Sequence, residues 1–327
     1  MTRYDLAPIA FLALSLAACP GTGESNTLDT AQGGDAQTAT DTATDAASAP
    51  DTDTDTDTAA DTDTAADTAP PSGGVVVNEV IAAALDGGDD RVELMNRDLT
   101  AAADISGWSL GDDGGHTWVI PPGTTIPAGG LLVFAESDFG FGLGESDAVY
   151  LTDAAGAEVD VADWERGEAS LGWSFGRLPD GLGAPRTLNT PTPGAPNAEA
   201  AVADVVVNEI VAADEGGGDD WVELVNLGAA AVSLDGWQLG DDGGNRWTFP
   251  AEPLAPGAYR VIPQSDFGFG LGKADAVVLI TPAGVVAQST SWEDGEAAAG
   301  TSWGRSPTGV GAFGTLATVS PGAANPE

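Results

Sequence analysis

The sequence feature that most constrains the fold of this chain is an internal repeat with a period of about 128 to 130 residues. Three pairs of matching segments define the repeat: VVVNEV at 75–80 and VVVNEI at 205–210, DDRVELMN at 89–96 and DDWVELVN at 219–226, and SDFGFGLG at both 137–144 and 265–272. The two copies join at TPTPGAPN, residues 190–197, whose prolines and glycine are typical of a loop. The repeat therefore predicts two like domains, one over 75–198 and one over 204–327.

Each copy is a succession of short segments with strand character. Residues 75–82 are rich in β-branched side chains, and 91–95 alternate between outward and inward positions. Residues 108–110 and 117–120 flank an Asp-Gly turn, which is typical of a β-hairpin. Neither copy shows a sustained helical period. Roughly seven or eight short strands in about 120 residues predict an all-β sandwich of two sheets, which can bury a core without disulfides.

The order of motifs within each copy resembles that of the lamin tail domain. The motifs of the first copy are VNEV at 77–80, DDRVELMN at 89–96, SGWSL at 106–110, PPGTTIPAG at 121–129, DAVYLTD at 147–153, SFGRLPDG at 174–181 and TPTPGAPN at 190–197. The resemblance implies two tandem immunoglobulin-like β-sandwiches that act as binding or scaffolding modules, a type of domain also found in secreted bacterial proteins. The chain lacks the coiled coil and the basic surfaces of nuclear lamins, so nuclear partners are not expected.

The N-terminus reads as a bacterial lipoprotein signal over residues 1–19. Residues 6–18 are apolar except for Ser15, which makes a run too short to span a bilayer but suited to a secretory signal. The run ends in Leu-Ala-Ala-Cys, which resembles a lipobox, and Cys19 is the single cysteine of the chain. We expect a lipid on Cys19 that anchors the protein to the outer membrane or cell surface. The alternative is an ordinary signal peptide cut near Ala18.

Residues 20–74 consist almost entirely of Thr, Asp, Ala, Gly, Ser and Pro, with Leu28 as the single large aliphatic residue and without aromatic residues or bases. Such a composition cannot bury enough apolar surface to fold, so a disordered acidic linker is predicted, with calcium binding or glycosylation as alternatives. The whole chain has 51 acids, 10 bases and a net charge of −41. This charge repels nucleic-acid phosphates and favours divalent cations, basic proteins or cationic glycans as partners.

Four aspartates are candidate calcium ligands: Asp112, Asp113, Asp241 and Asp242, which lie in Gly-rich turns of the two copies. Calcium binds six to eight oxygen ligands, of which paired aspartates can supply some. The alternative is that these residues only shape hairpin turns. His116 is the single histidine, and the second copy has Asn245 in its place. One imidazole supports neither a catalytic triad nor a zinc site, so a surface turn residue is expected.

Two glutamate pairs, Glu79 with Glu93 and Glu209 with Glu223, are candidates for general acid/base chemistry on neighbouring strands. The alternative, which the family resemblance favours, is that they satisfy backbone groups near strand ends. Among the tryptophans, Trp164, Trp221 and Trp292 are candidates either for sugar platforms or for packing in the core.

These observations predict a non-enzymatic, lipid-anchored envelope or surface protein that binds or scaffolds through two lamin-tail-like domains. No catalytic residue and no resident cofactor are expected, and the partners are the membrane and an envelope or extracellular protein or glycan, not a nucleic acid. Two alternatives remain open at this point: a calcium-dependent adhesion module, and a metal-dependent hydrolase that uses the acidic clusters.

Overall fold

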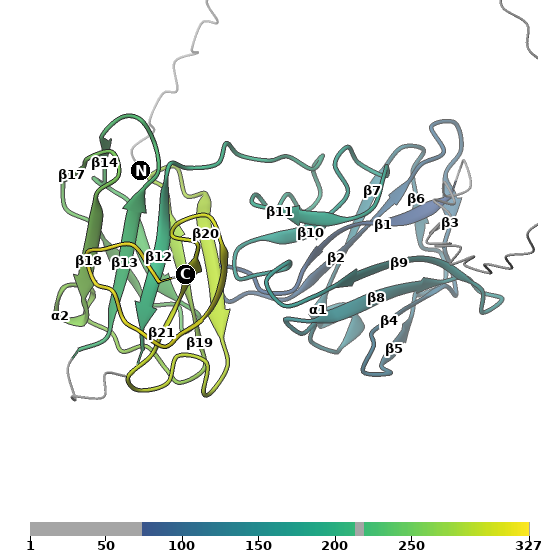
Figure 1. Ribbon diagram of the computed structural model, residues 1–327. Coiled ribbons are helices and arrows are strands. Elements are labelled where there is room, and N and C mark those ends of the chain that lie inside the picture. Colours follow the sequence, from purple (N-terminus) through teal and green to yellow (C-terminus); the bar gives the residue numbers. More distant parts are fainter. Residues whose placement is uncertain (1–73, 213–218, 327) are drawn as a thin grey trace, which may run out of the picture. The chain divides into compact units, whose positions relative to one another are not determined.

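The computed structural model describes residues 74–212 and 219–326. The predicted signal, Cys19 and the acidic linker lie outside these residues, so the structure says nothing of them. The described part is built almost entirely from antiparallel strands, and each copy of the repeat forms one β-sandwich (Figure 1). No helix in this part of the chain has the length and apolar character needed to cross a membrane.

The first sandwich pairs a five-stranded sheet with a four-stranded sheet. The larger sheet has the order β11-β10-β1-β2-β7, from Arg186–Leu188, Ser174–Gly176, Val75–Ile81, Arg91–Asn96 and Leu131–Ala135. The smaller has the order β5-β4-β8-β9, from Thr117–Val119, Ser109–Gly111, Asp147–Thr152 and Glu158–Trp164. A short ladder joins β3 (Ala103–Asp104) to β6 (Thr125–Ile126), and α1 spans Glu136–Phe139.

The second sandwich repeats this topology strand for strand. Its five-stranded sheet has the order β18-β13-β12-β21-β22, from Tyr259–Pro263, Trp221–Asn226, Val205–Val211, Ser302–Ser306 and Ala312–Leu316. Its four-stranded sheet has the order β16-β15-β19-β20, from Arg246–Thr248, Gln238–Asp241, Asp275–Ile280 and Val286–Trp292. The ladder β14 (Val232–Ser233) with β17 (Pro253–Leu254) and the helix α2 (Gln264–Phe267) complete it. The prediction of two tandem immunoglobulin-like sandwiches is confirmed.

Each sandwich encloses its own apolar core between the two sheets. The indoles of Trp164 and Trp292 are among the largest fully buried side chains, and each donates a hydrogen bond of 3.1 Å, to the carbonyls of Gly144 and Gly272 respectively. The sugar-platform interpretation of these two tryptophans is therefore wrong, because no face of either ring is open to a ligand. Trp221 lies half-buried at the start of β13.

The duplicated SDFGFGLG segment closes one side of each core. Its first three residues lie in the four-residue helix α1 or α2, which is too short to produce a helical period in the sequence. Gly140 ends α1 in the left-handed region at φ 80°, where a side chain would be strained. The helix places the Phe139 ring 4.9 Å from that of Phe141, and both pack on the core. The loop is then held by Asp90, whose carboxylate accepts the Leu143 N–H at 2.7 Å.

The buried Phe139 ring should account for much of the stability that this segment contributes to the first sandwich. We expect Phe139→Ala to lower the free energy of unfolding of the first sandwich by about 3 to 5 kcal/mol, through lost burial and the cavity left behind. Urea denaturation followed by tryptophan fluorescence measures it. The control is Leu99→Ala, because Leu99 is 78% exposed and its loss should change stability by no more than about 0.5 kcal/mol. Equal small effects of both variants would contradict the assigned packing.

Candidate functional site

The first candidate site is a pair of glutamates buried in the larger sheet of the first sandwich. Glu79 on β1 and Glu93 on β2 are register partners, next to a bulge between Val77 and Glu79. Each residue is only 1% exposed. Glu79 accepts hydrogen bonds from the Ser174 hydroxyl at 2.7 Å and from the Thr192 N–H at 3.0 Å. The sequence analysis therefore placed the two carboxylates together correctly.

Glu93 completes the attachment of the segment that follows β11. Its carboxylate accepts the Asn78 side-chain amide at 2.8 Å and the Gly194 N–H at 2.7 Å. Residues 190–197, called here the first closing segment, are thus held by both glutamates. With this segment in place every residue of β1 is buried. The carboxylates hold the segment and are closed off from any substrate, so the geometry gives no support to acid/base catalysis by this pair.

Two asparagines extend this network across the sheet. The Asn197 amide donates to the carbonyls of Asn78 at 3.1 Å and Arg177 at 2.8 Å. The Asn197 side-chain oxygen accepts the Thr192 hydroxyl at 3.0 Å, and the Asn78 side-chain oxygen accepts the Gly181 N–H at 2.8 Å. Buried polar groups are stable only when they are hydrogen-bonded, and here the side chains of one patch satisfy each other and the backbone.

The second sandwich builds the same network with residues 318–325, the second closing segment. The equivalent hydrogen bonds are Ser302 Oγ to Glu209 at 2.6 Å, Ser320 N to Glu209 at 3.1 Å, Asn208 Nδ2 to Glu223 at 2.9 Å, Gly322 N to Glu223, and Asn325 Nδ2 to the Asn208 carbonyl at 3.1 Å. Because both copies keep the arrangement, the interpretation of all four glutamates as satisfying backbone and neighbouring groups agrees with the structure.

Burial sets the ionisation of these carboxyls. Burial raises the pKa of Glu93 to about 7, against the lowering effect of its bonds to Asn78 and Gly194, and the charges of Glu79 and Asp180 add to the rise. Burial also raises the pKa of Glu79 and of Glu223. The second copy has Thr308 in place of Asp180, so its pair has one fewer acidic neighbour.

The aspartates proposed as calcium ligands lie in the predicted turns. Asp112 accepts the His116 N–H at 2.7 Å, and its other oxygen lies 2.6 Å from His116 Nδ1. Asp241 accepts both the N–H and the side-chain amide of Asn245 at 2.7 Å. These two aspartates therefore shape the turns, and His116, whose side chain is 64% exposed, is the surface turn residue that was expected.

The other two aspartates each face a further carboxylate. Asp147 raises the pKa of Asp113, and burial together with Asp275 raises the pKa of Asp242 to about 7. Within residues 74–212 and 219–326, no group of three or more His, Cys, Asp or Glu side chains is arranged to hold a metal ion. The geometry thus provides carboxylate pairs at these turns but not a ligand cluster.

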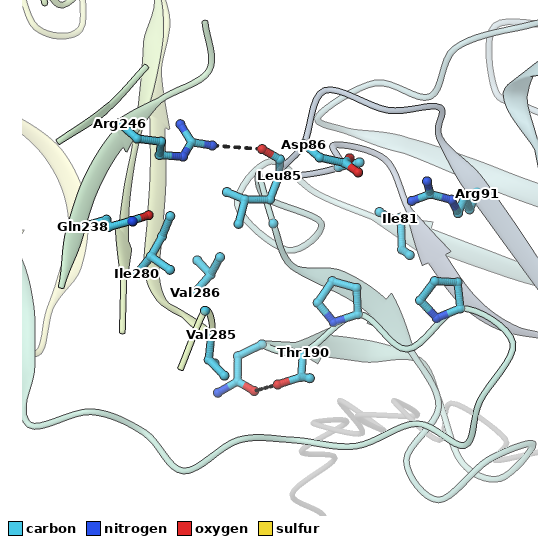
Figure 2. A pocket seen from close by; sticks show the side chains of 16 residues that line it. Ile81, Leu85, Asp86, Arg91, Thr190, Gln238, Arg246, Ile280, Val285 and Val286 are labelled. Atoms are coloured by element: carbon cyan, nitrogen blue, oxygen red, sulfur yellow. Dashed lines mark hydrogen bonds between the residues drawn. The ribbon is translucent and has the colours of Figure 1, made fainter. Parts of the chain in front are cut away.

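The second candidate site is a pocket of about 520 Å³ lined by residues of both sandwiches, which the sequence analysis missed (Figure 2). Beside it, Val278, Ile280 and Val286 form an apolar cluster with side chains of the first sandwich that include Leu85 and Trp173. Polar contacts accompany this cluster: Trp173 Nε1 donates to the Val286 carbonyl at 3.0 Å, Arg166 pairs with Glu296 at 2.6 and 2.9 Å, and Arg246 Nη2 donates to the Leu85 carbonyl at 2.9 Å.

A signal for the pocket was present in the differences between the copies. Ile280 and Val286 of the second copy correspond to Thr152 and Glu158 of the first. Each of these is a register pair at the same place in its sheet. An apolar pair at an outward position in one copy only indicates a surface that the fold itself does not require.

Comparison with known proteins identifies one family. Residues 68–166 and 198–294 match the family model described as the lamin tail domain. No curated protein matches the chain. One solved structure with some likeness is the exo-β-D-glucosaminidase CsxA, described with castanospermine- and australine-type inhibitors. It is 17% identical over 63% of this chain, with a TM-score of 0.19, and the chain spans about a quarter of its length. This likeness carries no argument about function.

The buried glutamates should make the first sandwich less stable as the pH rises. A carboxyl with a raised folded-state pKa stabilises the fold fully below the unfolded value of 4.5, and the contribution is lost as the pH rises through about 7. We therefore expect the free energy of unfolding to fall between pH 5 and pH 8, and to fall less in Glu93→Gln, which cannot ionise. Urea denaturation at the two pH values measures this.

The control for this experiment is Glu252→Gln, because Glu252 lies in an ion pair with Arg260 that is about a third exposed. It removes one negative charge but leaves the buried pair intact, so it should keep the pH dependence of the unaltered protein. An identical pH dependence in Glu93→Gln would show that Glu93 titrates normally and would refute the assignment.

Proposed function

Because the chain belongs to the lamin tail domain family, we propose that it is a non-enzymatic, lipid-anchored protein of the bacterial cell envelope whose two sandwiches form a binding or scaffolding module. The observation that carries this proposal is the structural role of the polar residues that both copies share. Asn78, Glu79 and Glu93, and their counterparts in the second copy, are buried and hydrogen-bonded to a closing segment. They serve the fold, which leaves the surfaces and the pocket for function.

The membrane is the first proposed partner, through a lipid on Cys19. The support is the sequence: the single cysteine directly follows Leu-Ala-Ala at the end of an apolar run. Pro20, in place of an aspartate, is compatible with the outer membrane or cell surface. The acidic segment 20–74 would then separate the sandwiches from the anchor. The other partner is an envelope or extracellular protein or glycan, since the net charge of −41 opposes nucleic-acid binding.

Calcium-dependent adhesion is the second candidate function, and one observation favours it. Asp113 faces Asp147, and Asp242 faces Asp275, so each sandwich has two carboxylates whose mutual repulsion a cation would relieve. The metal-dependent hydrolase has no comparable support, because the glutamate pairs on which it would depend are closed off from substrate.

The anchor is tested by Cys19→Ser. We expect the unaltered chain to sediment with membranes and the variant to remain soluble, because the thiol is the only attachment point for the lipid. Mass spectrometry of the mature N-terminus provides the second measurement. Ser25→Ala, which changes one nearby hydroxyl, should leave the protein on the membrane. A Cys19→Ser chain that still sediments with membranes would contradict the proposed anchor.

Calcium is tested by the thermal unfolding of the full chain in EDTA and in millimolar calcium. A protein that acts as a metal-free scaffold should unfold at the same temperature in both buffers, because calcium then gains no differential binding to the folded state. A clearly higher unfolding temperature in calcium than in EDTA, absent in Asp242→Asn, would instead favour the adhesion function over the scaffold.

A further inference from the structure

The pocket in Figure 2 has apolar walls supplied by both sandwiches. Ile81 and Leu85 line it from the first, and Ile280, Val285 and Val286 line it from the second. Figure 2 shows these side chains around a common space. A pocket of about 520 Å³ with mostly apolar walls and a few polar groups has the size and composition typical of small-molecule sites.

The walls consist of residues that the sandwich fold does not need. At the positions of Ile280, Val285 and Val286, the first copy has Thr152, Ala157 and Glu158 and still forms the same strands. Leu85, Ile280 and Val286 are apolar although they lie outside both main cores. The second sandwich therefore has an apolar outer surface at a place where the first sandwich is polar.

Two arginines give the pocket a positive charge. Arg91 and Arg246 lie at opposite sides of it in Figure 2, and in the other copy their positions hold Trp221 and Thr117. This is unusual in a chain with 10 bases and 51 acids. Among the described residues, no carboxylate oxygen lies within 4.0 Å of either guanidinium. Asp86 is the one acid of the lining, and it accepts the Gly88 N–H at 3.1 Å.

Arg246 is held in place by backbone carbonyls and makes no direct ion pair among the described residues. Its guanidinium donates to the carbonyls of Asp241 at 2.9 Å, Asn245 at 2.6 Å and Leu85 at 2.9 Å. Burial lowers the pKa of Arg246, against the raising effect of the nearby Asp241 charge. An anionic group beside the guanidinium would provide a direct partner, and guanidinium binds carboxylates through two parallel hydrogen bonds.

From this arrangement we infer that the pocket binds an amphiphile with an aliphatic body and a single carboxylate head, the body against Ile280 and Val286 and the head beside Arg246 or Arg91. The inference rests on the proposed function as a binding module and names the class of ligand. Apolar walls exclude a strongly hydrated ligand such as a nucleotide, and the arginines exclude a metal ion or a cationic amphiphile.

The test uses the full chain carrying Cys19→Ser, so that no attached lipid competes for the pocket. Sodium decanoate, below its micelle concentration, is titrated by calorimetry and by methyl NMR of isoleucine and valine. We expect saturable binding of one decanoate per chain, with shifts of pocket methyl groups. Decan-1-ol, which has the same chain without the charge, should bind about tenfold more weakly or worse, and decyltrimethylammonium should not bind.

Two variants place first-copy residues in the pocket, where the same fold already accepts them. Arg246→Thr should weaken decanoate about tenfold or more while leaving decanol unchanged, and Val286→Glu should abolish the binding of both. The matched control is Arg260→Thr, because Arg260 lies on β18 in the other sheet of the same sandwich, pairs with Glu252 and does not line the pocket. Its affinity for decanoate should equal that of the unaltered chain.

Two results would overturn the inference. Absence of saturable decanoate binding to the unaltered pocket refutes it directly, and this arm does not depend on how any variant folds. Equal affinity for decanoate and decanol, with no effect of Arg246→Thr, refutes the assignment of the charged head. Failure of the proposed function is distinguished by co-sedimentation of the same chain with purified envelope fractions: if the chain still binds there but not decanoate, only the ligand class is wrong.

Discussion

The hydrogen bonds between two buried glutamates and a closing segment are the interaction on which each sandwich depends. A buried carboxyl without a cation is costly unless donors surround it, and the N–H groups of Thr192 and Gly194 supply those donors for Glu79 and Glu93. These hydrogen bonds attach the closing segment to the sheet, and all seven residues of β1 are buried. One polar requirement thus links the first strand of the domain to its last residues.

Residues that both copies share serve the fold, whereas residues that differ between the copies are candidates for function. The network of Asn78, Glu79 and Glu93 recurs in the second sandwich with nearly identical distances, and so does the contact of Asp90 with the SDFGFGLG loop. The pocket residues differ between copies, as with Arg246 and Thr117. Duplication doubled the fold, and divergence changed the surfaces, so a function beyond the fold is expected where the copies disagree.

Much of the architecture could be predicted from the sequence, because each element has a local cause. The repeat predicts two like domains, and the Asp-Gly turns predict hairpins. The alternation in 91–95 predicts a strand with one exposed face; the strand is present, but Val92, Glu93 and Leu94 are all buried, because the closing segment covers the outward face at Glu93. The helices α1 and α2 gave no periodic signal because they have four residues each. The sequence offers core packing or a sugar platform for Trp164, and only the burial of the side chain decides for the core, because a flanking sequence does not say which face of a strand is covered.

The sequence by itself determined the fold class, the duplication and the acidic character, because strand period, turn chemistry and charge are properties of neighbouring residues. Only the tertiary structure decided what the singled-out residues do. Glu93 and Gly194 are far apart in the chain, and only their hydrogen bond shows that the carboxyl holds the closing segment and is closed off from substrate. The pocket likewise exists only where Leu85 and Val286 meet, since a cavity is a property of surfaces brought together from distant parts of the chain.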